Sequence, residues 1–146
     1  MNILAAIDFS SVTPCMLEAL VRLPLAKDAH VYLVHAAEPD PDFVGWDAGP
    51  DTVRDQVAAM FHREHRELEG HAESLRDKGL TVTALLIQGA TVDVILREAD
   101  KLDADMIVVG THGHGAAYDL IVGSISSGII RKSKVPVLVV PCPKRD

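Results

Sequence analysis

The chain has 146 residues, of which 48% are hydrophobic and 24% are charged. This length and composition are typical of one globular domain, residues 1–146, with a core of its own. The formal net charge of −7 argues against non-specific nucleic-acid binding, which needs a basic surface. The start MNILAAIDFSS lacks the basic region of a signal peptide, and no apolar run approaches the roughly 20 residues that span a bilayer. We therefore expect a cytoplasmic protein without membrane insertion, in which Cys15 and Cys142 are two reduced thiols.

Strands and helices are predicted to alternate along the chain. Short apolar runs indicate five strands, at residues 2–8, 30–37, 80–89, 105–110 and 135–140. Apolar residues at three- and four-residue steps predict four helices between them, at residues 13–27, 52–78, 91–104 and 124–133. Pro14 suits the first turn of the first helix, Pro24 ends or bends that helix, and Thr91 is interpreted as the N-cap of the third. Residues 38–51, rich in proline and glycine, are predicted to connect two elements as a loop.

This alternation, with each strand almost entirely apolar, predicts an α/β fold in which helices cover both faces of a parallel sheet. Right-handed crossovers between the strands then give an open doubly wound, Rossmann-like sheet of order 3-2-1-4-5. Ligands of such sheets bind beyond the carboxyl ends of the strands, where the strand order reverses. The rule selects the ends of the first and fourth strands, at Asp8 and Gly110.

A glycine-rich segment follows the fourth strand. Gly110 and Gly113 lie at the end of that strand, and Gly123 precedes Ser124 at the start of the next helix. Glycine lets a backbone approach a ligand closely, and a helix N-terminus offers N–H groups and a partial positive charge to phosphate. The serine hydroxyls within residues 124–127 add further donors. The segment predicts a phosphate site, although a plain strand-to-helix connection would have a similar composition.

The spacing within this segment is more specific than its composition. Gly110-x2-Gly113-x9-Gly123-Ser124 matches the motif G-x2-G-x9-G-[S/T], and in it the chain resembles the nucleotide-binding branch of the universal stress protein family. The stretches AIDFS, YLVHAAE and SKVPVLVVP are similar to that family's first-strand end, second strand and terminal strand. The resemblance covers nearly all of the chain. It implies a protein that binds an adenine nucleotide, ATP, and has a regulatory or sensing role in a stress response.

The resemblance also implies roles for individual residues. It places Asp8 on the ribose and on a Mg²⁺ ion that accompanies the nucleotide. The walls and amide contacts of the adenine pocket are implied for Ala6, Ile7 and Ala36. The segment against the ribose and the phosphates is implied to include Val109, Gly110, His112 and Gly113. The phosphate cradle is implied for Gly123, Ser124, Ile125 and Ser126.

Two departures from known phosphate sites leave alternatives open. Residues 114–122 contain no lysine or arginine, where relatives often place a basic residue, and the chain has no GxxxxGK[ST] P-loop. The phosphate charge would then be balanced by Mg²⁺, by the helix dipole and by a protonated His112 or His114. AMP or ADP is therefore an alternative ligand. A slow ATPase that uses the same pocket is the rival enzymatic function, and a structural dimeric partner with an empty pocket is a third.

Three histidines outside the glycine-rich segment have simpler interpretations. His62 and His65 lie three residues apart on the second helix, a spacing that zinc sites use, but the charged residues around them indicate a solvated face. His35 lies inside an apolar strand and is interpreted as a hydrogen-bonded structural residue instead of a catalytic base.

The fifth strand, Val135–Val140, is predicted to lie at an edge of the sheet and contains no charged residue. An uncharged edge exposes unpaired backbone groups and invites aggregation unless something covers it. We therefore expect a homodimer in which this strand pairs with its copy about a two-fold axis, as the family resemblance also implies. A regulatory protein partner, of unknown identity, is the remaining expected partner.

Overall fold

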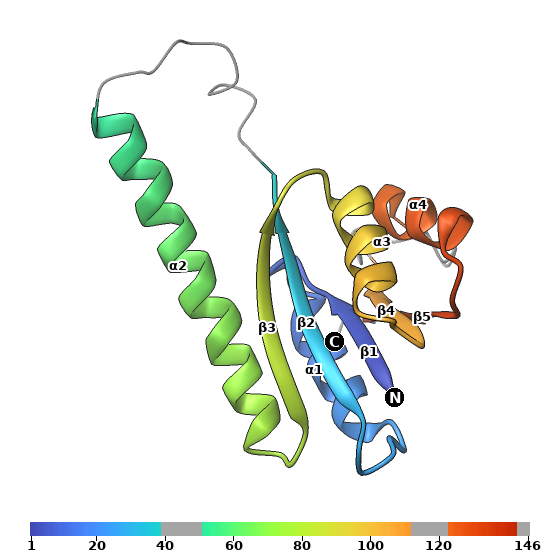
Figure 1. The fold of residues 1–146 in the computed structure, drawn as a ribbon. Helices are drawn as coiled ribbons and strands as arrows, with labels where there is room; N and C mark the ends of the chain where they lie inside the picture. Colours follow the sequence, from blue (N-terminus) through green and yellow to red (C-terminus); the bar gives the residue numbers. More distant parts are fainter. Residues whose placement is uncertain (39–50, 112–122, 143–146) are drawn as a thin grey trace.

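The computed structural model describes residues 1–38, 51–111 and 123–142. Five strands and four helices alternate within these ranges (Figure 1). The strands are β1 (Asn2–Ala6), β2 (His30–Ala37), β3 (Thr81–Gln88), β4 (Met106–Gly110) and β5 (Val137–Val140). The helices are α1 (Thr13–Arg22), α2 (Asp51–Arg76), α3 (Thr91–Lys101) and α4 (Ser124–Lys132). No helix in the described part of the chain is both long enough and apolar enough to cross a membrane.

The five strands form one parallel sheet of order β3-β2-β1-β4-β5, which confirms the predicted fold. The central strand β1 lies between β2 and β4, so that Leu4 pairs with Tyr32 on one side and with Ile107 on the other. Strand order reverses between β1 and β4, because consecutive connections run to opposite sides of β1. This reversal opens a crevice at the carboxyl ends of the two strands.

Four of the predicted strands are longer than the observed ones, and β1 and β5 differ most. β1 ends at Ala6 instead of Asp8, although the Ile7 N–H still donates to the Val34 carbonyl at 2.9 Å. β5 begins at Val137 instead of Val135, although the Pro136 carbonyl accepts a hydrogen bond from Ile107 at 3.0 Å. In both cases the pairing continues for one hydrogen bond beyond the regular strand. Apolar composition alone does not mark where regular pairing stops.

Each face of the sheet has its own hydrophobic core. α1 and α2 cover one face and α3 and α4 the other (Figure 1). Side chains alternate along β1, with Ile3 and Ala5 in the first core and Leu4 in the second, and all three are fully buried. Burial on both sides explains why the strands are apolar runs without polar alternation.

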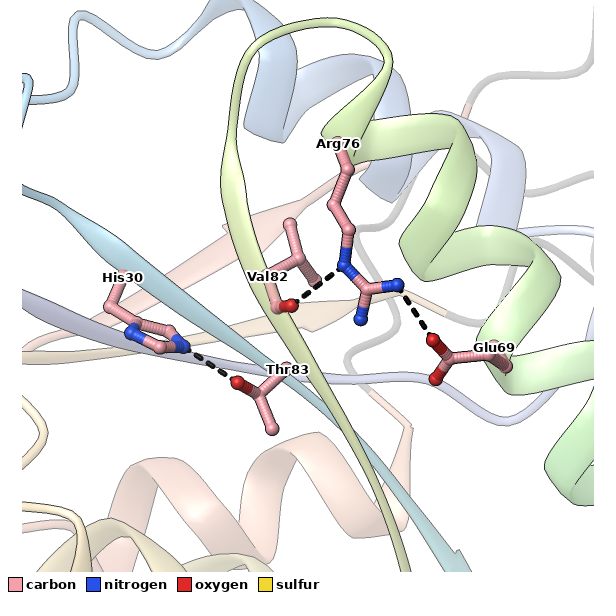
Figure 2. A network of polar contacts seen from close by, with 5 residues as sticks. All are labelled: His30, Glu69, Arg76, Val82 and Thr83. Atoms are coloured by element: carbon pink, nitrogen blue, oxygen red, sulfur yellow. Dashed lines mark hydrogen bonds and ion pairs between the residues drawn. The ribbon is translucent and has the colours of Figure 1, made fainter.

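The outer edge of β3 is bonded to the end of α2. Arg76 in the last turn of α2 donates its Nε–H to the Val82 carbonyl at 2.9 Å, while its Nη1 contacts Glu69 Oε1 at 2.6 Å (Figure 2). Backbone groups of successive residues point to opposite sides of a strand, and the Gly89 N–H donates to Ala37 of β2. Val82 is an odd number of residues before Gly89, so its carbonyl points away from β2. Arg76 therefore supplies a donor to an acceptor that the sheet itself leaves unpaired. Between β3 and its neighbour β2, the side chains of Thr83 and His30 share a hydrogen bond of 2.7 Å (Figure 2).

The two cysteines contradict the expectation of reduced thiols. Cys15 in α1 and Cys142, just after β5, form a disulfide, with their Cα atoms 5.6 Å apart although 127 positions separate them in the sequence. The crossover connections place α1 against β4 and β5, which brings Cys15 and Cys142 together. Distance along the sequence was therefore a poor guide to distance in space.

Candidate functional site

A cavity lies at the carboxyl ends of β1 and β4, between the starts of α1 and α4. The described residues enclose about 70 Å³ of it, mostly between apolar side chains. Eight residues predicted for the site line this cavity: Ala6, Ile7, Asp8, Ala36, Val109, Gly110, Ile125 and Ser126. They come from β1, β2, β4 and α4, so the topology brings together four segments that are far apart in the sequence.

Two further predicted residues are described but do not line the enclosed space. Gly123 and Ser124 lie at the beginning of α4, directly before Ile125 in its wall. His112 and Gly113 lie outside the described residues, as do residues 114–122, so their predicted contacts with ribose and phosphates stay predictions. Sequence reasoning missed six lining residues, which are Ser10, Val12, Met16, His35, Thr91 and Ile129.

Three of these six residues have sequence patterns that fit either a core position or a cavity wall. Met16 and Ile129 occupy positions at helical spacing, which predict burial in a core but cannot tell a core from a cavity wall. His35 was assigned a structural role, and its Nδ1 does form a hydrogen bond of 2.8 Å with the Ile7 carbonyl. Its ring also lines the cavity. A residue can thus support a site and border it at once.

Gly110 has a packing role that the sequence did not predict. A Cβ at this position would lie 2.4 Å from Val12 Cγ1 and 3.0 Å from Met16 Sδ. Both side chains belong to the beginning of α1, which therefore packs directly onto the end of β4. The missing side chain makes room for this helix, and the predicted contact of Gly110 with a ligand stays a prediction.

Ser126 is also engaged within the protein. Its side chain is buried, and its hydroxyl donates to the Gly110 carbonyl at 2.9 Å. This bond ties the first turn of α4 to the end of β4. The hydroxyl proton is thus already used, and what Ser126 can offer a ligand is its backbone N–H.

The start of α4 has no capping side chain among the described residues. Its N-cap is Gly123, and the backbone N–H of Ser127 donates the first hydrogen bond of the helix to the Gly123 carbonyl at 2.9 Å. The N–H groups of residues 124–126 precede that bond and have no acceptor within the helix. Together with the helix dipole, they form a local centre of positive potential next to the cavity.

The start of α3 is capped from another part of the chain. Ala90, and not Thr91 as predicted, is the N-cap, and it has no side chain that could accept a hydrogen bond. Glu38, which follows β2, accepts hydrogen bonds from the Thr91 N–H at 3.0 Å and from the Thr91 hydroxyl at 2.9 Å. These two bonds, the backbone one first, hold the pKa of Glu38 below its ordinary value of 4.5. A carboxylate therefore already occupies this helix start.

The turn after β1 is fixed by short-range contacts. The Asp8 carboxylate is exposed and accepts a hydrogen bond from the Ser10 N–H at 3.0 Å. Phe9 has a φ of 58°, in the left-handed region, and its ring centroid lies 4.3 Å from that of His35. Among the described residues, no three His, Cys, Asp or Glu side chains gather as metal ligands. A cation beside Asp8 would thus need further oxygen ligands from a bound molecule.

Comparison with known proteins agrees with this fold. The model of the universal stress protein family matches residues 1–141. The chain belongs to that family. A universal stress protein of Thermus aquaticus is 35% identical over 121 residues, which cover 79% of this chain and 80% of the relative.

Solved structures of other proteins share the architecture. Protein MJ0577 of Methanocaldococcus jannaschii matches with a TM-score of 0.79 at 24% identity, over 99% of this chain and 97% of that one. A universal stress protein of Archaeoglobus fulgidus, solved in complex with dAMP, matches with a TM-score of 0.64 at 22% identity, over 96% and 97% of the two chains. At these identities the likeness shows a common fold.

The cap at the start of α3 in this universal stress protein predicts a pH dependence. Because the folded-state pKa of Glu38 is lowered, its ionised form stabilises the fold above pH 4.5, and this stabilisation is lost as the pH falls through the lowered pKa. Glu38→Gln should reduce the free energy of unfolding near neutral pH by about 0.5 kcal/mol, since the carboxylate is exposed to solvent. Urea unfolding at about pH 7 and about pH 3 measures the difference.

The matched control is Glu73→Gln, at an exposed position of α2. The destabilisation by Glu38→Gln should shrink at the lower pH, whereas the control should change little at either pH. An equal loss of stability at both values would show that the charge of Glu38 does not act through this cap.

Proposed function

We propose that this universal stress protein binds an adenine nucleotide, ATP foremost, as a regulatory or sensing module of a cytoplasmic stress response. The observation that carries the proposal is an apolar cavity at the reversal of strand order, adjoining a helix start that no side chain of the described residues caps. Such a pairing suits a ligand with a flat apolar ring at one end and phosphate at the other. Two neighbours in fold, solved in complex with cAMP and with dAMP, bind ligands of this class.

The charges around the cavity favour one orientation of the ligand. Glu38 occupies the start of α3 and would repel a phosphate there, whereas no carboxylate of the described residues caps the start of α4. The phosphates would therefore lie at residues 123–126, and the adenine between the aliphatic walls that include Ile7 and Val109. Asp8 would accept a hydrogen bond from a ribose hydroxyl or hold Mg²⁺ with the phosphates. His112 and Gly113 would complete the phosphate side.

The phosphate position predicts the effect of a substitution at Gly123. Its φ of −57° and ψ of 161° are accessible to other residues, so Gly123→Val changes the side chain without forcing the backbone. The added methyl groups should crowd the phosphate and weaken ATP binding about tenfold or more, equivalent to about 1.4 kcal/mol. Isothermal titration calorimetry with ATP measures the loss.

Gly70→Val is the matched control, because a Cβ at Gly70 in α2 meets no atom within 4 Å. It should leave the ATP affinity unchanged. If Gly123→Val also bound ATP as the unsubstituted protein does, the phosphates could not lie at the start of α4.

The lack of a basic residue in residues 114–122 predicts that metal and ligand act together. Mg²⁺ should supply the charge that a lysine supplies elsewhere, and ATP carries more phosphate charge than AMP. Removing Mg²⁺ with EDTA should therefore weaken ATP binding more than AMP binding. Titrations of both nucleotides, with and without EDTA, test this expectation, and equal sensitivity would mean that protein groups neutralise the phosphates.

The proposal includes a homodimer through β5. The carbonyls of Pro136 and Val140 accept hydrogen bonds from β4 and from Thr111 just after it. Because the backbone groups of successive residues point to opposite sides of a strand, the N–H and C=O of Val139 point to the open side of the edge. Pairing with the same strand of a second copy would satisfy these groups. Val139→Pro removes one outward donor and spares the bonds to β4, because proline is tolerated at edge positions.

Sedimentation at micromolar concentration should show a dimer for the unsubstituted protein and a shift toward monomer for Val139→Pro. The helical content of the variant, read from circular dichroism, serves as the control for folding. A monomeric unsubstituted protein would contradict the pairing.

A further inference from the structure

The disulfide links a wall of the cavity to the edge of the sheet. Cys15 lies on α1 between Val12 and Met16, and both of these neighbours line the cavity. Cys142 follows Val140 by two residues, and the Val140 carbonyl accepts a hydrogen bond of 3.0 Å from Thr111. Thr111 in turn follows Gly110, another lining residue. The link therefore joins two segments that both reach the end of β4.

The contact that this link spans is a close one. The room left by Gly110 is occupied by Val12 and Met16, which an added Cβ would meet at 2.4 Å and 3.0 Å. The Cys142 sulfur also lies 3.7 Å from the Ser11 carbonyl, in the turn before α1. A covalent bond across this contact restricts how far α1 can move away from β4 and β5. Its loss would leave only non-covalent packing to hold the cavity wall.

The disulfide can be reached from outside the cavity. Both cysteines are partly exposed. A groove of about 490 Å³ runs between α1 and β5 and is lined by Cys15 at one point and by Pro141, the neighbour of Cys142, at another. An attacking thiol could thus approach the sulfur atoms without first entering the cavity.

We propose that Cys15 and Cys142 form a thiol–disulfide exchange site that controls the α1 wall of the cavity. In the reducing direction, the thiolate of a small thiol or protein dithiol attacks one sulfur, forming a mixed disulfide and releasing the other cysteine as a thiolate. A second thiol of the reductant then attacks the reductant's sulfur in the mixed disulfide and releases the remaining cysteine as a thiolate. The products are two cysteine thiols and one oxidised reductant, a transfer of two electrons and two protons. A disulfide of the same class reverses the reaction.

The consequence for the cavity follows from preorganisation. The oxidised form holds the α1 wall in place, whereas the reduced form must restrict that wall each time a ligand binds. This part of the inference rests on the proposed function: the oxidised protein should bind ATP more tightly. Coupling between two sites is reciprocal, so ATP should make the disulfide harder to reduce by the same factor. In the cytoplasm, disulfides are rare and are usually transient or redox-sensing, which agrees with a switch.

The first experiment tests the switch without a nucleotide. The full chain is equilibrated in buffers of reduced and oxidised glutathione, its thiols are counted by alkylation and mass spectrometry, and amide hydrogen exchange is measured in both forms. Reduction should produce two thiols per monomer, and re-oxidation should restore the link within one chain. The Thr111 and Met16 amides should exchange about tenfold faster after reduction, whereas amides of β2 should not change.

The Cys15→Ser/Cys142→Ser double variant is the control for the reductant. It should resemble the reduced protein and should not respond to glutathione. The comparison of the two forms of the unsubstituted protein remains decisive if the variant fails to fold. A link between two chains, a disulfide that does not re-form, or equal exchange of Thr111 and Met16 in both forms would overturn the proposal.

The second experiment measures ATP affinity by calorimetry in the two forms. The reduced protein should bind about fivefold more weakly, at the lower end of typical coupling between sites. Equal affinity in both forms would overturn the switch and leave the proposed function standing. Absence of binding in both forms would instead overturn the proposed function, and the amide exchange of Thr111 and Met16 would then decide the switch by itself.

Discussion

The cavity depends on the packing of α1 onto the end of β4 at Gly110. Val12 and Met16 fill the space that any side chain at this position would need. This contact sets the distance between the turn after β1 and the start of α4, because Ser126 binds the carbonyl of the same glycine. The cavity walls from β1, β4, α1 and α4 therefore meet around one residue. The Cys15–Cys142 disulfide links the same helix, α1, to the segment that follows β5.

The two helix starts beside the cavity differ in charge for a structural reason. Neither Gly123 nor Ala90 carries a side chain that could cap its helix. At α3 the deficit is filled by Glu38, which the parallel pairing of β2 with β3 brings alongside Thr91. At α4 the described residues provide no capping side chain. The same physical requirement is thus met internally at one helix, whereas under the proposed function a phosphate would meet it at the other.

The sequence alone determined the fold and much of the set of lining residues. Apolar runs separated by helical periods require a parallel sheet with two covered faces, and right-handed crossovers leave few alternatives to the order β3-β2-β1-β4-β5. The rule that ligands bind where strand order reverses selected Asp8 and Gly110, and the spaced glycine motif added the start of α4. The fold prediction was confirmed because it depends on local periodicity and on topology, both of which are properties of short segments and of their order.

Tertiary structure alone decided which long-range partners each residue has. Cys15 and Cys142 were expected as free thiols, Thr91 as a cap, Ser126 as a hydroxyl donor to phosphate and Gly110 as room for a ligand. Each of these residues contacts a segment that is distant in the sequence, and the ligand contacts predicted for Ser126 and Gly110 stay predictions. A hydroxyl, a thiol or an absent side chain has the same local signature whatever it meets, so its role is fixed only when the crossovers have brought α1, β4, β5 and α4 together.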